Sequence, residues 1–300
     1  MSPLRWTCKS TRQLAAELKK HGHPMSPQKV GQMLRAMGYS PQSTRKGKEG
    51  ASHPDRNAQF EHINEQVKAF QKRDAPVISV DTKKKELVGA FKNAGREWQP
   101  EGEPERVNVY DFIGDASGKA IPYGIYDLSK NLGWVNVGID HDTAQFAASS
   151  IRSWWSGMGE KLYPEAKELL ITADGGGSNG YRTHQWKAEL QKIADDTGLR
   201  VSVSHFPPGA SKWNKIEHRL FCHITQNWRG RPLTDFETIV QLIGNTRTNA
   251  RLRVRARLDR RKYPIELKVS KSEVASLRIL RQDFHGEWNY TIVPRLNSTP

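Results

Sequence analysis

Three acidic residues stand where carboxylates can gather around divalent metal ions. Asp81 ends the β-rich run V-I-S-V-D, and Asp174 ends the apolar run L-L-I-T-A-D. Glu217 lies on a segment expected to be helical, shortly after a second β-rich run. Mg²⁺ prefers carboxylate oxygens, and two such ions ~3.5–4 Å apart can activate a nucleophile and stabilise a leaving oxygen. The chemistry open to these residues is metal-assisted cleavage and transfer of a phosphodiester.

The elements around these acids favour a shared site. A single acid of this kind is more often a solvated surface residue or a helix cap. Here an amphipathic helix with Trp186, Leu190 and Ile193 on one face separates the two β-rich runs, so residues 169–220 predict one β-α-β-α unit. Such an order brings all three acids to one end of a sheet, which favours the functional interpretation.

The residues beside the acids suggest supporting roles. Gly175 and Gly176 directly follow the second acid and are expected to leave room for a nucleic-acid backbone. Ser211, Asn214 and Glu217 recur every three residues, which predicts that they lie on one side of the last helix. Asn214 is expected either to hydrogen-bond a metal-bound water or a phosphate, or to cap that helix.

The histidines do not have the spacing of a zinc site. His141 lies next to Asp142, and His218 lies five residues before His223, whereas a helical zinc pair has i, i+4 spacing. We expect Asp142, together with Thr143, to cap the following helix instead.

The order of the remaining elements predicts a ribonuclease-H-like mixed sheet flanked by helices. Strand candidates are residues 107–113, 121–126 and 134–139, the last two joined by a hairpin connection. We expect residues 55–300 to form this catalytic domain. It begins with a helix near 55–73, carries an insertion at about 83–106, and ends in a basic extension at about 230–300.

Residues 1–40 predict a helix-turn-helix-like DNA-binding segment. One helix is expected at about 10–20, and Ser26-Pro27 starts a second one that ends before Gly38. Its predicted buried stripe consists of Val30, Met33, Leu34 and Met37. Its outward face carries Gln28, Lys29, Gln32 and Arg35, which can reach base edges and phosphates.

The plain alternative for residues 1–40 is an ordinary helical hairpin with a polar face. Two short helices cannot enclose a core, so we expect this domain to be incomplete. Residues 41–54 are polar, basic and glycine-containing, which is typical of a linker.

The charge is unevenly distributed. Residues 1–75 hold 14 Lys/Arg against 6 Asp/Glu, residues 76–217 hold 17 against 19, and residues 218–300 hold 16 against 7. Basic flanks around a slightly acidic centre favour a nucleic-acid partner over a merely solubilising surface. Only Cys8 and Cys222 are present, which excludes a disulfide framework. No apolar run approaches the ~18–20 residues of a membrane span, so we expect a soluble, intracellular protein.

The run R-L-R-V-R-A-R-L at 251–258 alternates strictly. As a strand it would place Leu252, Val254, Ala256 and Leu258 on a buried face. The other face would carry four arginines, Arg251, Arg253, Arg255 and Arg257. We expect them to hold a DNA backbone without reading bases; a solvated face is the alternative.

Three motifs carry a resemblance: V-I-S-V-D at Asp81, T-A-D-G-G-G-S-N at Asp174, and P-P-G-A-S-K-W-N-K-I-E at Glu217. With them the chain resembles a DDE-type transposase of a bacterial insertion sequence, within the retroviral integrase superfamily. The resemblance implies that these acids form the catalytic triad and bind two Mg²⁺ or Mn²⁺ ions. It also implies double-stranded DNA as partner, both the terminal inverted repeats of the element and the target, and a homo-oligomer. The expected location is the bacterial cytoplasm, in association with the nucleoid.

Two other functions stay open at this point. A structure-selective nuclease or resolvase would use the same core without strand transfer. A DNA-binding regulator would carry the core as a catalytically dead scaffold, which the intact set of three acids disfavours.

Overall fold

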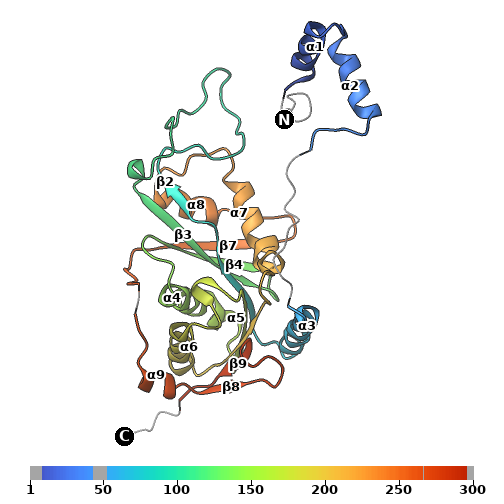
Figure 1. The fold of residues 1–300 in the computed structure, drawn as a ribbon. Helices are drawn as coiled ribbons and strands as arrows, with labels where there is room; N and C mark the ends of the chain where they lie inside the picture. The colour runs from blue at the N-terminus through green and yellow to red at the C-terminus, as the bar shows by residue number, and fades with distance from the viewer. Residues whose placement is uncertain (1–8, 43–52, 266, 296–300) are drawn as a thin grey trace. The chain divides into compact units, whose positions relative to one another are not determined.

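The computed structural model describes residues 9–42, 53–265 and 267–295. The chain divides into two compact units, residues 1–49 and 50–300, which Figure 1 shows coloured along the chain. Residues 43–52, most of the segment predicted as a linker, lie outside the described residues, as does Cys8.

The described residues of unit 1, 9–42, form the helices α1 (Thr11–Lys20) and α2 (Pro27–Ala36). The hydroxyl of Ser10 accepts a hydrogen bond from the Gln13 N–H at the start of α1. The hydroxyl of Ser26 accepts one from the Lys29 N–H at the start of α2. Both serines thus satisfy backbone donors that the first helical turn leaves free, and the predicted helix starts are confirmed.

The predicted buried stripe of α2 is wrong at its two methionines. Val30 is buried, but Met33 is 42% exposed and Met37 is 66% exposed. Among the described residues of unit 1, only Val30 and Ala15 are buried hydrophobics. Within the described residues of unit 1, the two ten-residue helices bury only part of the apolar stripe and leave the methionines at the surface.

Unit 2 consists of a mixed sheet with helices on both faces. Its helices are α3 (Arg56–Lys72), α4 (Ala144–Trp154), α5 (Glu160–Leu162), α6 (His184–Thr197), α7 (Cys222–Asn227), α8 (Phe236–Gly244) and α9 (Lys271–Ala275). Its strands are β1 (Val77–Thr82), β2 (Glu86–Val88), β3 (Gly118–Asp127), β4 (Leu132–Gly138), β5 (Glu168–Ala173), β6 (Arg200–His205), β7 (Arg253–Asp259), β8 (Ile279–Arg281) and β9 (Asn289–Ile292).

The strand order is β7-β4-β3-β1-β5-β6-β9-β8, with β2 paired to β3 at one side. Strands β1, β5 and β6 are parallel, whereas β3 is antiparallel to both β1 and β4. The central order β4-β3-β1-β5-β6, with β3 reversed, is that of the ribonuclease-H-like core. The predicted fold class and the predicted hairpin between β3 and β4 are confirmed.

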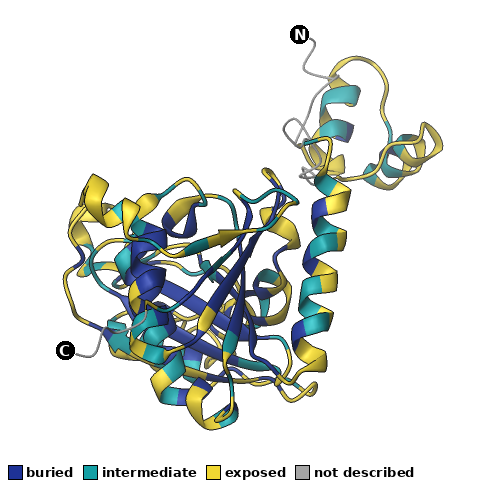
Figure 2. Ribbon diagram, turned by 90° about the horizontal axis from the view of Figure 1, so that it is seen from below, coloured by how far each residue is buried: buried dark blue, intermediate teal, exposed yellow. Residues whose placement is uncertain are grey.

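The two faces of the sheet enclose separate cores. On one face, α4 and α6 pack through Phe146, Ile151 and Trp186 against strand residues such as Ile78 and Tyr123. On the other face, residues of α7, α8 and the turn before α7 pack against β3, β4 and β7, while α3 packs on β1 and β5. Figure 2 shows the buried residues gathered in the strands and in the helix sides that face them.

Two local predictions in unit 2 are wrong. Residues 107–113 form no strand, because Val109, Tyr110 and Phe112 are exposed and no sheet edge receives them. A strand does form earlier in the chain: β2 lies inside the segment predicted as an insertion. The predicted cap of α4 is confirmed for Thr143, whose hydroxyl accepts a hydrogen bond from the Phe146 N–H, and is wrong for Asp142.

No helix in the described parts of the chain has both the length and the apolar character needed to cross a lipid bilayer.

Candidate active site

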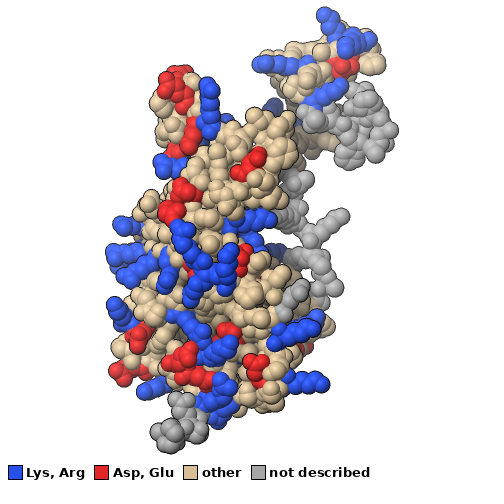
Figure 3. Space-filling model, turned by 90° about the vertical axis from the view of Figure 1, so that its left-hand side faces the viewer, with Lys and Arg blue, Asp and Glu red and all other residues tan. Residues whose placement is uncertain are grey.

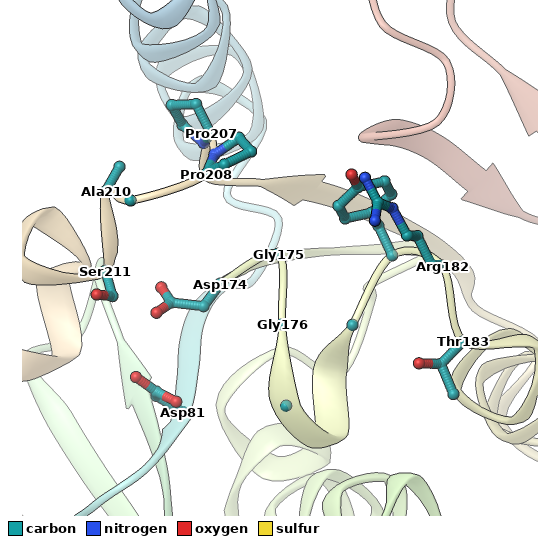
Figure 4. A pocket seen from close by; sticks show the side chains of 14 residues that line it. Asp81, Asp174, Gly175, Gly176, Arg182, Thr183, Pro207, Pro208, Ala210 and Ser211 are labelled. Carbon is teal, nitrogen blue, oxygen red and sulfur yellow. The ribbon is translucent and has the colours of Figure 1, made fainter. Parts of the chain in front are cut away.

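The first two acids meet because of the register between two parallel strands. β1 and β5 pair side by side up to Val80 and Ala173. The next residue on each strand is an acid, so Asp81 and Asp174 are neighbours at the carboxyl edge of the sheet. Figure 4 shows their carboxylates turned towards the same opening.

The third acid comes from a turn packed on the face of the sheet that α7 and α8 cover. Glu217 begins a π-helical turn (Glu217–Phe221) that continues into α7. This turn packs through Ile216, Leu220 and Phe221 on β3 and β4. The charge of Glu217 acts on both Asp81 and Asp174, which places the three carboxyls in one electrostatic cluster.

The cluster is short of positive charge. Burial, and next the negative charge of Asp174, raise the pKa of Asp81 to about 8. Burial raises the pKa of Asp174 to about 6, against a hydrogen bond from Asn214 that lowers it. Burial also raises the pKa of Glu217, against the positive charge of Lys83. Three oxygen-donor groups whose pKa values are raised in the absence of bound cations fit hard divalent ions such as Mg²⁺ or Mn²⁺.

Asn214 fixes the position of Asp174. Its amide nitrogen donates to Oδ1 of Asp174 at 3.1 Å and to the carbonyl oxygen of Val80 at 3.2 Å. Its amide oxygen accepts a short hydrogen bond from the hydroxyl of Ser79. That hydroxyl in turn accepts from the N–H of Ile216 at 3.2 Å. The fully buried Asn214 therefore ties β1, Asp174 and the Glu217 turn together.

The prediction that Ser211, Asn214 and Glu217 lie along one helix is wrong. Ser211 begins a short 3₁₀ turn that ends at Trp213, and Asn214 has an extended ψ of 126°. Glu217 belongs to the next turn. Because the side chain of Asn214 turns under β1, the helical path is broken there, and Asn214 neither caps a helix nor faces solvent.

An opening of about 720 Å³ lies in front of the two aspartates. Asp81 and Asp174 line it together with Ser211 and with two short segments, residues 175–177 and residues 207–209. Glu217 does not line this opening. A Cβ added at Gly176 would meet no atom within 4 Å. The packing of the protein therefore does not require a glycine at position 176. Room for a ligand remains the predicted reason for this glycine.

Two residues near the acids were missed from the sequence. Lys83 is buried, with its Nζ 3.2 Å from Glu86 and 4.3 Å from the ring centroid of Trp228. His205 is fully buried, with Nδ1 3.0 Å from the carbonyl oxygen of Asp174. Lys83 directly follows β1 and stands two residues after Asp81. In an extended chain this spacing puts both side chains on the same side, and it could have indicated Lys83 from the sequence.

The predicted DNA-binding residues lie on elements other than those that carry the acids. Gln28, Lys29, Gln32 and Arg35 are exposed on α2, in unit 1. Arg253, Arg255 and Arg257 are exposed on β7, whereas Arg251 precedes that strand with a positive φ of 65°. Three strand spacings separate β7 from β1, roughly 14 Å. Figure 3 shows Lys and Arg side chains gathered across the middle of unit 2 on the viewed face.

Comparison with known proteins identifies a family. Residues 1–294 match the family model described as the Rhodopirellula transposase DDE domain. None of the curated proteins matches the chain.

Solved structures with a similar fold are complexes of the Mos1 transposase. They include a paired-end complex with the left transposon end (13% identity, TM-score 0.47, 80% of this chain and 66% of that chain covered). A pre-cleavage Mos1 transpososome is similar at 13% identity and a TM-score of 0.48, with 80% and 67% covered. A Mos1 paired-end complex with Mn matches at 14% identity and a TM-score of 0.44, with 78% and 65% covered. The chain thus spans about two thirds of the length of these proteins.

Proposed function

Because the chain belongs to the Rhodopirellula transposase DDE domain family, and so is a DDE-type transposase, we propose that it cleaves DNA strands at the ends of its element. We propose further that it joins the freed ends to target DNA. The catalytic residues in this proposal are Asp81, Asp174 and Glu217.

The observation that carries the proposal is the convergence of these acids. They come from two adjacent parallel strands and from a turn packed on the face of the sheet that α7 and α8 cover. Burial raises the pKa of all three carboxyls, and negative charge from the cluster further raises the pKa of Asp81 and of Asp174. Such shifts cluster at functional sites, and in the described parts of the chain no ion pair gives Asp81 or Asp174 the positive charge that would lower its pKa.

The three carboxylates would hold two Mg²⁺ or Mn²⁺ ions. When bound, such ions activate the attacking oxygen and stabilise the leaving oxygen of the phosphodiester. Two buried residues would orient Asp174 in this site. The amide of Asn214 donates to its carboxylate, and Nδ1 of His205 contacts its carbonyl oxygen. Gly175 and Gly176 leave space at the opening for the backbone of a DNA strand.

The proposed partner is double-stranded DNA, both element ends and target. The two basic flanks of the sequence support this, because neutralised phosphates supply most of the affinity for DNA. Joining two ends to one target requires both ends in one assembly, so we propose a homo-oligomer as the active form. An end-joining complex that contains a single chain would disprove this.

The test is cleavage of DNA that carries the sequences flanking the gene, in the presence of Mg²⁺. The variants Asp81→Asn, Asp174→Asn and Glu217→Gln each remove one negative charge at nearly constant volume. We expect each to lose nicking and joining while retaining DNA affinity. The matched control is Asp140→Asn, since Asp140 also follows a strand but lies against Tyr263.

The products separate the proposal from its alternatives. Sequencing should recover both nicked ends and strands joined to target DNA. Nicked but never joined products would point to a nuclease instead, and unchanged nicking by any of the three variants would remove that residue from the site.

A further inference from the structure

A second cluster of metal-ligating side chains lies at the start of α3, on residues far apart in the sequence. His53, Asp55 and His285 each offer one ligand atom, and these atoms all lie within 4.8 Å of one another. Nε2 of His285 is 2.9 Å from Oδ2 of Asp55, and Nδ1 of His53 is 4.0 Å from the same oxygen. Asp55 directly precedes α3, and His285 lies in the loop between β8 and β9.

Asp55 is not used as its position would suggest. It occupies the N-cap position of α3, where an aspartate ordinarily accepts a hydrogen bond from the first turn. Its side chain makes no such capping bond. The carboxylate is turned to His285 instead, so the cluster takes priority over the helix cap.

The ring of His285 is held from two further sides. Its Nδ1 is 2.8 Å from the carboxylate of Glu287. The ring of Trp288 stacks on it at 4.2 Å between centroids, and the same Trp288 ring meets His53 edge-on at 4.9 Å. His285 itself has a positive φ of 44°, an uncommon conformation for a non-glycine residue. A carboxylate on Nδ1 that directs Nε2 towards a ligand site is the usual arrangement behind a metal-binding histidine.

We propose that His53, Asp55 and His285 form a binding site for one divalent cation of the zinc class. Zinc takes nitrogen and oxygen ligands in tetrahedral geometry at ~2.0–2.2 Å, so its ligand atoms lie roughly 3.3 Å apart. The two separations here, 2.9 Å and 4.0 Å, lie on either side of that spacing. Water would complete the coordination, since Asp55 is exposed.

The donor set distinguishes this site from the acidic one. Imidazole nitrogens select zinc and similar transition metals, whereas an all-carboxylate set suits Mg²⁺ and Mn²⁺. Binding would require two local changes. The ion would replace the contact between Nε2 of His285 and Oδ2 of Asp55, and Nδ1 of His53 now accepts a hydrogen bond from the Asp55 N–H at 3.2 Å. The metal would take up that lone pair or the other ring nitrogen of His53.

The bound ion would fasten the start of α3 to the β8–β9 hairpin. A second contact already links the same two elements one turn further on, where Gln59 of α3 donates to Asn289 at 3.0 Å and to the carbonyl oxygen of His205 at 2.8 Å. Strand β9 pairs with β6, which pairs with the Asp174 strand β5. The role of the ion is therefore structural, and its loss would loosen the edge of the sheet rather than remove the acids.

The experiment is titration of the full, chelator-treated chain with Co²⁺, whose visible absorption is strong in tetrahedral coordination and weak in octahedral coordination; the histidine variants identify the ligands. We expect about one equivalent with imidazole ligands, displaced by Zn²⁺, and a higher unfolding temperature with Zn²⁺. His53→Ala and His285→Ala should each lose this equivalent. Asp55→Asn keeps the shape of the side chain and should weaken binding. Glu287→Gln should bind ~10–100-fold more weakly, as loss of an orienting carboxylate does.

Two controls make the outcome decisive. His23→Ala removes an exposed histidine from the H-G-H turn and should keep the equivalent. Asp174→Asn should keep it too, so that failure of the acidic site and failure of this site are distinguishable. Wild-type binding by His53→Ala and His285→Ala, or no nitrogen-ligated Co²⁺ at all, would leave the cluster as a hydrogen-bonded ion pair and overturn the proposal.

Discussion

The amide of Asn214 donates a hydrogen bond to the Oδ1 atom of Asp174 across 3.1 Å, inside the protein and without solvent access to Asn214. This bond lowers the pKa of Asp174, whereas burial and Glu217 raise it. Asn214 thus favours the ionised, oriented form of a carboxylate whose pKa is raised by its other surroundings.

Asn214→Ala should therefore weaken the response to Mg²⁺ more than it weakens the fold. It removes the donor to Asp174 and leaves the Ser79 hydroxyl without its acceptor. We expect ~10–100-fold lower cleavage at limiting Mg²⁺, partly restored at high Mg²⁺. The matched control is Asn136→Ala, another fully buried asparagine, bonded to Ser150 and Asp259. An equal Mg²⁺ requirement in both variants would show that only general destabilisation had been measured.

Gly124 allows the Glu217 turn to approach the sheet. It pairs with Asp81 across β1 and β3, and a Cβ there would come 2.8 Å from Cζ of Phe221 and 2.9 Å from Cδ1 of Ile216. Gly124→Ala should cost ~1–3 kcal/mol of stability by overpacking and should lower cleavage, because Ile216 precedes Glu217. Urea unfolding and cleavage assays test this, with Gly114→Ala, which meets no atom within 4 Å, as control. Wild-type stability and wild-type cleavage in Gly124→Ala would mean that the Glu217 turn can move away from the sheet without cost.

Asp81 should destabilise the metal-free protein as the pH rises. Its folded-state pKa is about 8, against 3.8 for the free side chain. Between these values the unfolded chain releases the proton first, so the free energy of unfolding falls from about pH 4 to about pH 8. Asp81→Asn removes this effect. Urea unfolding in a chelator should find the variant more stable near pH 8, on the order of 1–3 kcal/mol after solvent screening, and equal to wild type near pH 4. A constant difference across that range would contradict the raised pKa.

The position of the acids was predictable where local pattern and sheet geometry agree. Asp81 and Asp174 each end a β-rich run, and parallel neighbouring strands bring such ends together. The role of Asn214 was not predictable, because it depends on the chain leaving a helical path to place one side chain under β1.

Long-range pairing explains the other misses. His285 meets Asp55 across 230 positions, and no local periodicity announces such a contact. The strand predicted at residues 107–113 is missing for a related reason. The β-forming side chains are present, but no described strand pairs with them. Propensity without a partner does not make a strand.

Recognition of element ends should depend on α2. Lys29, Gln32 and Arg35 are exposed on this helix. Replacing all three with Ala should weaken binding to end DNA relative to unrelated DNA, since base contacts contribute ~1–3 kcal/mol each. Competition binding measures the ratio, with Lys19→Ala on α1 as control. An unchanged footprint on end DNA would place recognition elsewhere.

The arginine strand β7 should hold a DNA backbone. Arg253, Arg255 and Arg257 face outward while Leu252 and Val254 are buried, as the alternation predicted. Arg255 donates to the carbonyl oxygen of Gly157 at 3.3 Å. Within the described residues, none of the three forms an ion pair with a carboxylate. Such a row repels itself unless a polyanion neutralises it.

Other arginines on this unit have acidic partners and provide the control. Arg260 pairs with Glu237, Arg231 with Glu97, and Arg152 with Asp196. Because their charge is already neutralised, they should release few counterions when DNA binds.

Replacing Arg251, Arg253, Arg255 and Arg257 with Gln should flatten the dependence of log affinity on log salt by about two to four units, since each phosphate contact contributes ~0.9. Strand joining should fall, and preference for end sequence should stay, because backbone contacts carry no base information. The triple Gln variant of the paired arginines should change the slope by less than one unit. If the slope is unchanged in the first variant, the strand does not touch DNA. If sequence preference falls instead, these arginines read bases, and β7 rather than α2 would be the recognition element.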